Sequence, residues 1–121
     1  MIYPENFESK IKFDKIRQLI SNNSLSDMGR ELVDNITFSS DADWIRTSLS
    51  ETAEFIRICQ EEENFPVSYY HDARPFLARV RVEGLFLEVN ELVILKNSLE
   101  SLNAITRFFN NKQEQYPSLV A

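Results

Sequence analysis

The stretch that decides the fold is residues 92–109, LVILKNSLESLNAITRFF. Apolar side chains recur there at alternating steps of three and four residues, and Thr106 is the one polar member of this seam. The seam consists of Leu92, Leu95, Leu99, Leu102, Thr106 and Phe109. Such spacing places side chains along one face of a helix, in the heptad pattern of helices that pack together. Because Val89, Ile105 and Phe108 broaden this face, the pattern predicts a packed bundle rather than an isolated two-stranded coil.

A second long helix is predicted upstream of the seam. Ser39, Ser40 and Asp41 are short polar residues suited to an N-cap, and a helical pattern runs from there to about residue 62. Its apolar face comprises Trp44, Ile45, Leu49, Thr52, Phe55, Ile56 and Cys59. Pro66 ends the pattern, because the residue before a proline disfavours the helical conformation.

Four shorter helices are expected elsewhere. Pro4 lies in the first turn of the first helix, and Asp14 is the N-cap of the second. Ser26 or Asp27 caps the third helix, and the fourth begins at Asp72 as N-cap and ends before Gly84 as its C′ residue. Gly29, inside the third helix, suggests the close approach of another helix, and plain tolerance of glycine is the alternative. Glu88 and Glu91 resemble a capping box before the last helix, although Glu88 lacks the usual hydroxyl. The sequence therefore predicts an all-α fold, an irregular bundle of about five to six helices in one domain over residues 1–121.

Glycine is scarce in this sequence. Gly29 and Gly84 are the only two glycines among 121 residues, about a quarter of the roughly 7% that is average. Phosphate-binding loops need several glycines within a few residues. The composition therefore excludes a Walker loop or a dinucleotide-binding fingerprint in this chain and predicts that the chain itself holds no cofactor.

The charge balance is acidic, with 13 basic and 19 acidic side chains and a formal net charge of −6. Because basic side chains supply most non-specific affinity for nucleic acids, such a chain is a poor DNA clamp by itself. Arg74, Arg79 and Arg81 form a local exception and are the candidates for contact with a DNA backbone. A solvated helix face is the simpler interpretation of the same three residues.

No set of residues predicts catalysis or metal binding. His71 is the single histidine, and no second histidine or cysteine lies at a ligand spacing from it. Glu61, Glu62 and Glu63 are consecutive, so they point in different directions around a helix, and we interpret them as a solvated helix end. Cys59, the only cysteine, is expected to be a buried small apolar residue. The chain is predicted not to be an enzyme.

The sequence also bears on location. No apolar run approaches the ~20 residues of a membrane span, and the N-terminal residues lack the basic and apolar regions of a signal peptide. We therefore expect a cytoplasmic protein without a membrane partner.

Read as a whole, the sequence resembles the N-terminal start of MutS-family proteins, and more narrowly the second bacterial MutS subfamily in its Bacteroidetes-type form. The matching segments follow in order: residues 1–17, Leu25 to Glu31, Thr52 to Phe55, Phe65-Pro66, Asp72 to Pro75, Arg79 to Gly84, Glu91-Leu92 and Tyr116 to Leu119. Each segment is short and carries no chemical signature, so the resemblance rests on the ordered set, which covers essentially the whole chain.

This resemblance implies that the chain is the start of the helical core and lever domain of a longer, dimeric ATPase. The longer protein is implied to use ATP and Mg²⁺, to bind branched DNA, and to act in DNA mismatch repair or the suppression of homologous recombination. Many members of the subfamily carry a C-terminal nuclease domain, and some act on stalled ribosomes. The family's ATPase and nuclease residues have no counterpart in this chain, so none is transferred.

The apolar end of the sequence, Ser118 to Ala121, leads us to expect a chain truncated at residue 121 whose partners include the remainder of the same protein. The implied role is a non-catalytic scaffold that transmits the nucleotide state to the DNA-clamping arms. The alternative is a stand-alone α-helical adaptor that binds a partner helix through the seam of residues 92–109.

Overall fold

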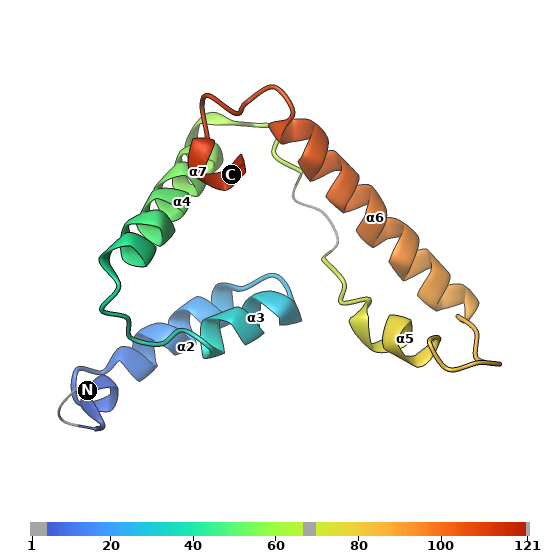
Figure 1. Cartoon of the computed structure of the whole chain (residues 1–121), viewed down its shortest axis with the longest axis horizontal. Coiled ribbons are helices and arrows are strands. Elements are labelled where there is room, and N and C mark those ends of the chain that lie inside the picture. Colours follow the sequence, from blue (N-terminus) through green and yellow to red (C-terminus); the bar gives the residue numbers. More distant parts are fainter. Residues whose placement is uncertain (1–4, 67–69, 121) are drawn as a thin grey trace. The chain divides into compact units, whose positions relative to one another are not determined.

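The computed structural model describes residues 5–66 and 70–120 and is shown in Figure 1. The described residues form seven helices and no strand, which confirms the predicted all-α class. The helices are α1 (Phe7–Lys10), α2 (Phe13–Asn23), α3 (Asp27–Asp34), α4 (Ala42–Glu61), α5 (Arg74–Arg79), α6 (Val89–Phe109) and α7 (Pro117–Val120). The sequence pattern did not predict α7, a single turn that begins at Pro117, where proline is well tolerated.

The chain divides into two compact units, Met1–Thr37 and Phe38–Ala121, which are described separately. The assignment of residues 1–121 to a single domain stays a prediction. Within the described residues no helix combines the length and the apolar composition that a membrane span requires.

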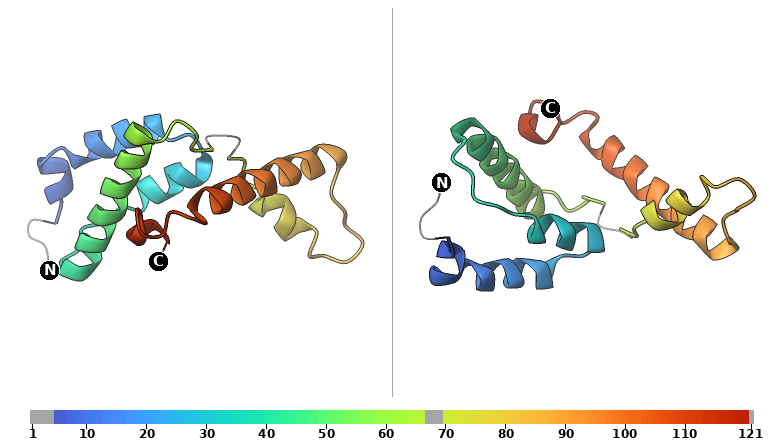
Figure 2. Two further views of the ribbon diagram at one scale, coloured as in Figure 1. Left: turned by 90° about the horizontal axis from the view of Figure 1, so that it is seen from above. Right: turned by 60° about the horizontal axis from the view of Figure 1, so that its bottom comes forward.

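In the first unit, α2 and α3 lie side by side, as both views in Figure 2 show. Arg17 on α2 connects the elements of this unit. Its Nη2 donates to the Glu8 carboxylate of α1 at 3.0 Å and to the carbonyl oxygen of Ile36, just after α3, at 2.7 Å. Val33 of α3 is buried. One guanidinium nitrogen therefore links α1, α2 and the residues after α3 in this unit.

The boundaries of α2 and α3 test the predicted caps. Ser26 is the N-cap of α3, and its Oγ accepts the N–H of Gly29 at 3.0 Å, as expected. A Cβ atom at Gly29 would lie 3.2 Å from that same Oγ, so the close neighbour of Gly29 is the helix's own cap and not another helix. Asp14 was wrongly predicted as the N-cap of α2, which begins one residue earlier, after Lys12 with φ of 61°. Pro4 lies outside the described residues.

The second unit contains the two long helices, and both begin where the sequence predicts. Asp41 caps α4, because its Oδ1 accepts the N–H groups of Asp43 at 3.0 Å and of Trp44 at 3.1 Å. At the start of α6, the N–H of Glu88 donates to Glu91 Oε2 at 2.9 Å. The carboxylate half of the capping box therefore forms without a hydroxyl at the N-cap.

Helix α5 is shorter than predicted. It begins after Ala73 and ends at Arg79, so Asp72 is not its N-cap and Gly84 is not its C′ residue. Asp72 lies one residue before the N-cap, Ala73, and its carboxylate still accepts the N–H of Arg74, the first helical residue, at 3.0 Å. Gly84 adopts φ of 85° in the turn that follows, a conformation that glycine reaches without steric cost.

The cap of α4 gives a test of the local structure. Replacing Asp41 with Ala removes the acceptor of two N–H groups and is expected to lower the free energy of unfolding by about 1 kcal/mol. Asp41→Asn keeps a capping oxygen and should retain most of this stability. Urea unfolding followed by circular dichroism measures both variants, and an equal loss in the two would show that the cap is not the cause.

Candidate functional site

The three arginines predicted to contact DNA lie on α5 and in the turn after it. Two of them are held by carboxylates. Arg74 forms a two-pronged pair with Asp72, with Nε to Oδ1 at 2.8 Å and Nη2 to Oδ2 at 2.7 Å, and Arg79 pairs with Glu91 at the start of α6. Arg81 is exposed, and no carboxylate pairs with it among the residues described. The structure therefore leaves one of the three guanidinium groups free of an ion pair with a carboxylate.

The carboxylates of these two pairs are stabilised in their ionised form. Hydrogen bonds from the Arg74 side chain, and then from its N–H, lower the pKa of Asp72. The N–H of Glu88 lowers the pKa of Glu91, and Arg79 lowers it further against the effect of desolvation. A phosphate group that approached Arg74 or Arg79 would have to displace a charged carboxylate in each case.

Residues 71–79 run along one flank of α6, as Figure 1 shows for α5. Arg79 contacts Glu91, and the carbonyl oxygen of His71 accepts a hydrogen bond from Ser98 Oγ at 3.2 Å. Glu91 and Ser98 are about two helical turns apart and therefore share one flank of the helix. This flank of α6 is covered by the chain itself.

The neighbouring face of α6 is open. Leu92, Leu99 and Leu102 of the predicted seam are 50%, 56% and 60% exposed. A shallow, open hollow follows this face and is lined by Leu92, Leu95, Lys96, Leu99, Glu100 and Asn103. The part of the predicted seam from Leu92 to Leu102 therefore lies at the surface of the helix. We call this the α6 seam surface.

An aromatic cluster joins the C-terminal ends of α4 and α6. The ring of Phe65 meets Phe55, Phe108 and Phe109 edge to face, with centroid separations of 5.4, 5.1 and 6.3 Å. Tyr116 extends the cluster, with its ring centroid 6.4 Å from that of Phe109. Edge-to-face aromatic pairs stabilise beyond the area they bury. Phe65 and Tyr116 therefore pack against the ends of the two long helices.

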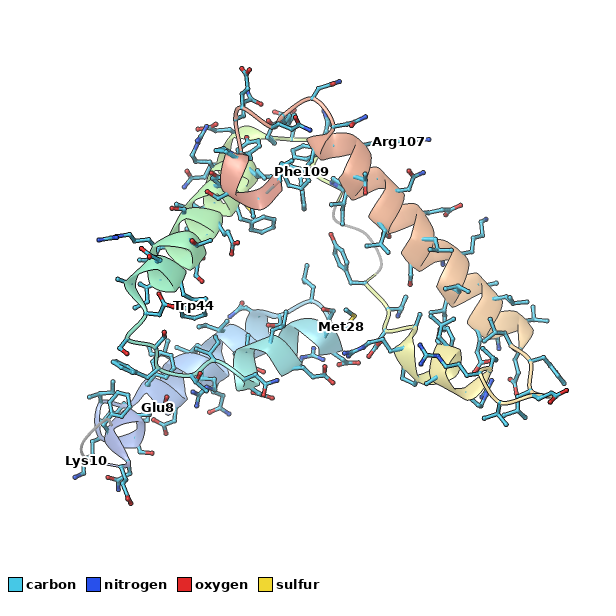
Figure 3. The ribbon with its side chains drawn as sticks, in the orientation of Figure 1. Glu8, Lys10, Met28, Trp44, Arg107 and Phe109 are labelled. Carbon is cyan, nitrogen blue, oxygen red and sulfur yellow. The ribbon has the colours of Figure 1, made fainter. Side chains whose placement is uncertain are left out.

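Arg107 and Phe109, both in the last turn of α6, have different surroundings. Figure 3 shows Phe109 and Arg107 pointing to different sides of the helix. Arg107 borders a second open hollow, together with Asn64, Pro66, Glu100, Asn103, Ala104 and Phe108. Phe108 therefore contacts the aromatic cluster and also borders this hollow, whose other lining residues are mostly polar.

Two carboxylates, one on α4 and one on the residue that caps its C-terminus, hold residues 112–120, which we call the C-terminal strap. Glu54 accepts the N–H groups of Ser118 and Leu119 at 3.0 Å through the same oxygen, Oε2. Two turns later, Glu62 pairs with Lys112 and accepts the Tyr116 hydroxyl at 3.2 Å. Both carboxylates thus act on backbone or side-chain donors at the far end of the sequence, and α7 packs against α4.

The face of α4 that meets the strap is not the one that the sequence predicts. Ile58, between the two carboxylates, is fully buried, whereas Cys59 is exposed and not buried as expected. Adjacent helical positions differ by about 100° in direction, so burying Ile58 turns Cys59 outward. Glu62 was also wrongly interpreted as part of a solvated helix end. No local pattern could have shown these contacts, because Glu54 and Ser118 are 64 residues apart.

No group of three or more His, Cys, Asp or Glu side chains among the described residues is placed to hold a metal ion. His71 is exposed, and its backbone carbonyl accepts a hydrogen bond from Ser98 Oγ. The second unit offers three features: the C-terminal strap bound to α4, the α6 seam surface, and the arginines near α5.

Comparison with known proteins supports a relationship to the MutS family. The chain is 30% identical to Endonuclease MutS2 of Ligilactobacillus salivarius over 101 residues and 29% identical to that of Staphylococcus saprophyticus over 101 residues. It is 25% identical to Endonuclease MutS2 of Latilactobacillus sakei over 111 residues. These alignments cover 84%, 84% and 92% of this chain but 13–14% of each relative, so the chain spans about an eighth of their length. No family model and no solved structure matches the chain.

The strap gives a pH-dependent prediction. Desolvation raises the pKa of Glu54, but the N–H groups of Ser118 and Leu119, together with Arg57, outweigh it and leave the pKa below 4.5. The pair with Lys112 and the Tyr116 hydroxyl lower the pKa of Glu62 against desolvation. Both carboxylates therefore stabilise the strap fully above pH 4.5, and this contribution is lost as the pH falls through their depressed pKa values.

We expect the amide protons of Ser118 and Leu119 to exchange faster with solvent as the pH is lowered below about 4.5, after correction for intrinsic exchange. Glu54→Gln should loosen these amides already at neutral pH and remove most of the pH dependence. Glu51→Gln, an exposed position on the same helix, is the matched control. An unchanged protection factor in Glu54→Gln would contradict the role of this carboxylate.

Proposed function

We propose that this chain is a non-catalytic helical scaffold region of a MutS-type DNA-binding ATPase. The observation that carries the proposal is the similarity to relatives named Endonuclease MutS2, which extends over 84–92% of the chain. The ordered resemblance of the sequence to the start of such proteins supports the same assignment. We assign the chemistry of the whole protein to parts outside the aligned region.

The finer assignment follows the resemblance. We place the protein in the second bacterial MutS subfamily, of Bacteroidetes type, as a cytoplasmic homodimer that uses ATP and Mg²⁺. Its proposed substrates are branched DNA structures, in DNA mismatch repair or the suppression of homologous recombination, and stalled ribosomes are a further proposed partner. The relatives' name includes an endonuclease activity, and we place any such activity outside this region.

The structure suggests how such a scaffold would work. Helix α6 has 21 residues and is therefore about 30 Å long. Arg79 binds it near its first turn, and the aromatic cluster around Phe65 binds it at its end. A stiff helix held at both ends can carry a displacement from one end to the other. In this proposal the change of nucleotide state reaches the DNA-binding parts along α6.

The coupling role is tested with two variants of the full-length protein. Phe65→Ala removes the central ring of the aromatic cluster and should reduce DNA-stimulated ATP hydrolysis severalfold while leaving basal hydrolysis unchanged. Phe86→Ala changes an exposed ring and should have no effect. The 121-residue chain alone, incubated with ATP and DNA, is expected to show no turnover. Turnover by that chain would overturn the assignment to a non-catalytic region.

Direct contact with DNA, if this region makes one, should depend mainly on Arg81. Arg74 and Arg79 are neutralised by Asp72 and Glu91, so Arg81→Ala should weaken binding most and reduce the salt slope of the affinity by about one. Arg46→Ala, on α4, is the control of equal charge change. Fluorescence anisotropy with a branched DNA at several salt concentrations measures this, and undetectable or salt-insensitive binding would end the proposal of a DNA contact here.

A stand-alone adaptor that binds a partner helix is the second candidate function. The observation in its favour is the α6 seam surface, on which Leu92, Leu99 and Leu102 are half exposed or more. An open reading frame that stops directly after Ala121 would favour this adaptor, whereas a Walker loop encoded downstream would establish the MutS-type ATPase.

A further inference from the structure

We propose that the C-terminal strap fixes the angle between α4 and α6, and that its release from α4 allows α6 to swing about the joint at the C-terminal ends of the two helices. The contacts of the strap with both helices carry this inference. They are independent of the assignment to a MutS-type protein.

The two long helices are joined by a contact that leaves their angle adjustable. Figure 1 shows α4 and α6 diverging from their C-terminal ends. At this joint the ring of Phe65 lies between the helices, because it contacts Phe55 of α4 and both Phe108 and Phe109 of α6. Aromatic pairs are stable over a range of separations and ring orientations. The Phe65 contact therefore joins the helices without fixing the angle between them.

The first half of the strap is attached to the end of α6. It follows α6 directly in the chain, and the N–H of Lys112 donates to the carbonyl oxygen of Phe109 at 3.0 Å. The Lys112 ammonium lies 4.2 Å from the centre of the Phe108 ring, and the ring of Tyr116 meets that of Phe109 edge to face. Both kinds of contact are attractive. This half of the strap therefore moves with α6.

The strap is also attached to α4, at two separate places. Glu62, the C-cap of α4, accepts the Tyr116 hydroxyl, and Glu54 accepts the N–H groups of Ser118 and Leu119. The two carboxylates are about two turns apart, or about 12 Å along the helix axis. A segment that is attached to α6 at one end and to α4 at two spaced points restrains rotation about the Phe65 contact. The strap therefore fixes the angle that the rings leave adjustable.

The strap can leave α4 as a unit. Helix α7, Pro117–Val120, is a single turn, and helices this short are not stable by themselves in water. The first N–H groups of a helix have no acceptor within it, and Glu54 accepts those of Ser118 and Leu119. Loss of the Glu54 contact therefore removes the cap and the helical turn together. The docked state is the major one, because it keeps Tyr116 buried at 1% exposure.

Helix α6 converts a small rotation at the joint into a larger displacement at its other end. With 21 residues it is about 30 Å long, so a rotation of about 10° moves its N-terminal end by about 5 Å. Arg79 of α5 pairs with Glu91 at that end and is carried with it. Release of the strap therefore changes the position of α5 and of the start of α6 relative to α4.

Double electron–electron resonance on the 121-residue chain measures this angle. Spin labels are attached through Arg46→Cys on α4 and Asn90→Cys at the start of α6, both at exposed positions, in a Cys59→Ser background. We expect one narrow distance distribution. Glu54→Ala removes the acceptor of both α7 N–H groups and should at least double the width of the distribution or add a second distance. Glu51→Ala, exposed on the same helix, is the matched control and should change nothing.

Tyr116→Phe is the second variant, because it removes the hydroxyl that Glu62 accepts and keeps the ring. It should broaden the distribution less than Glu54→Ala and retain the helical content measured by circular dichroism. If Glu54→Ala loses the helical content of α4, Tyr116→Phe decides, and an unchanged distribution in it overturns the proposal.

A broad distribution in the original chain, or an unchanged one in a folded Glu54→Ala variant, would also overturn the proposal. Amide exchange at Ser118 and Leu119 identifies the reason. Fast exchange with an unchanged distance shows that the strap opens without moving α6, and slow exchange shows that Glu54 does not hold the strap. The measurement needs neither ATP nor DNA, so its failure is distinct from failure of the proposed function.

Discussion

The unit Phe38–Ala121 depends on the burial of one side chain, Tyr116, which is 1% exposed. A phenol hydroxyl is costly to bury without a hydrogen-bond partner, and Glu62 of α4 accepts it at 3.2 Å. Lys112 balances the charge of that carboxylate, and the guanidinium of Arg57 lies 5.4 Å from the centre of the tyrosine ring. Tyr116 thus connects the C-terminal ends of α4 and α6 with the C-terminal strap.

Features that depend on neighbours within one helical turn could be predicted from the sequence. Asp41 and Ser26 cap α4 and α3 because a short polar side chain reaches N–H groups two or three residues ahead, whatever the rest of the fold does. The seam of α6 is equally local in origin, since spacing alone defines a helical face. The position of Gly84 shows the limit, because its positive φ was anticipated but the length of the preceding helix was not.

Contacts between distant segments could not be predicted in this way. The pattern on α4 shows which side chains are apolar but not which face another segment will meet, and the strap selects Ile58 instead of the predicted stripe. The arginines near α5 illustrate the same limit for function. Their sequence shows three positive charges, whereas the fold supplies Asp72 and Glu91 to two of them. An arginine in a sequence can be counted as a phosphate-binding residue only when it is known whether a carboxylate already pairs with it.

The shape of the α6 seam surface limits the kind of partner that can cover it. Fully burying an exposed leucine side chain stabilises by about 1.5–3 kcal/mol, and covering one that is half exposed contributes roughly half of this, so the row of leucines favours a partner that removes them from water. The row follows the helix axis, the hollow is shallow, and one flank is already occupied by residues 71–79. A small ligand would touch only one or two of these leucines, whereas a helix laid along the groove touches all of them. The surface is therefore suited to another helix.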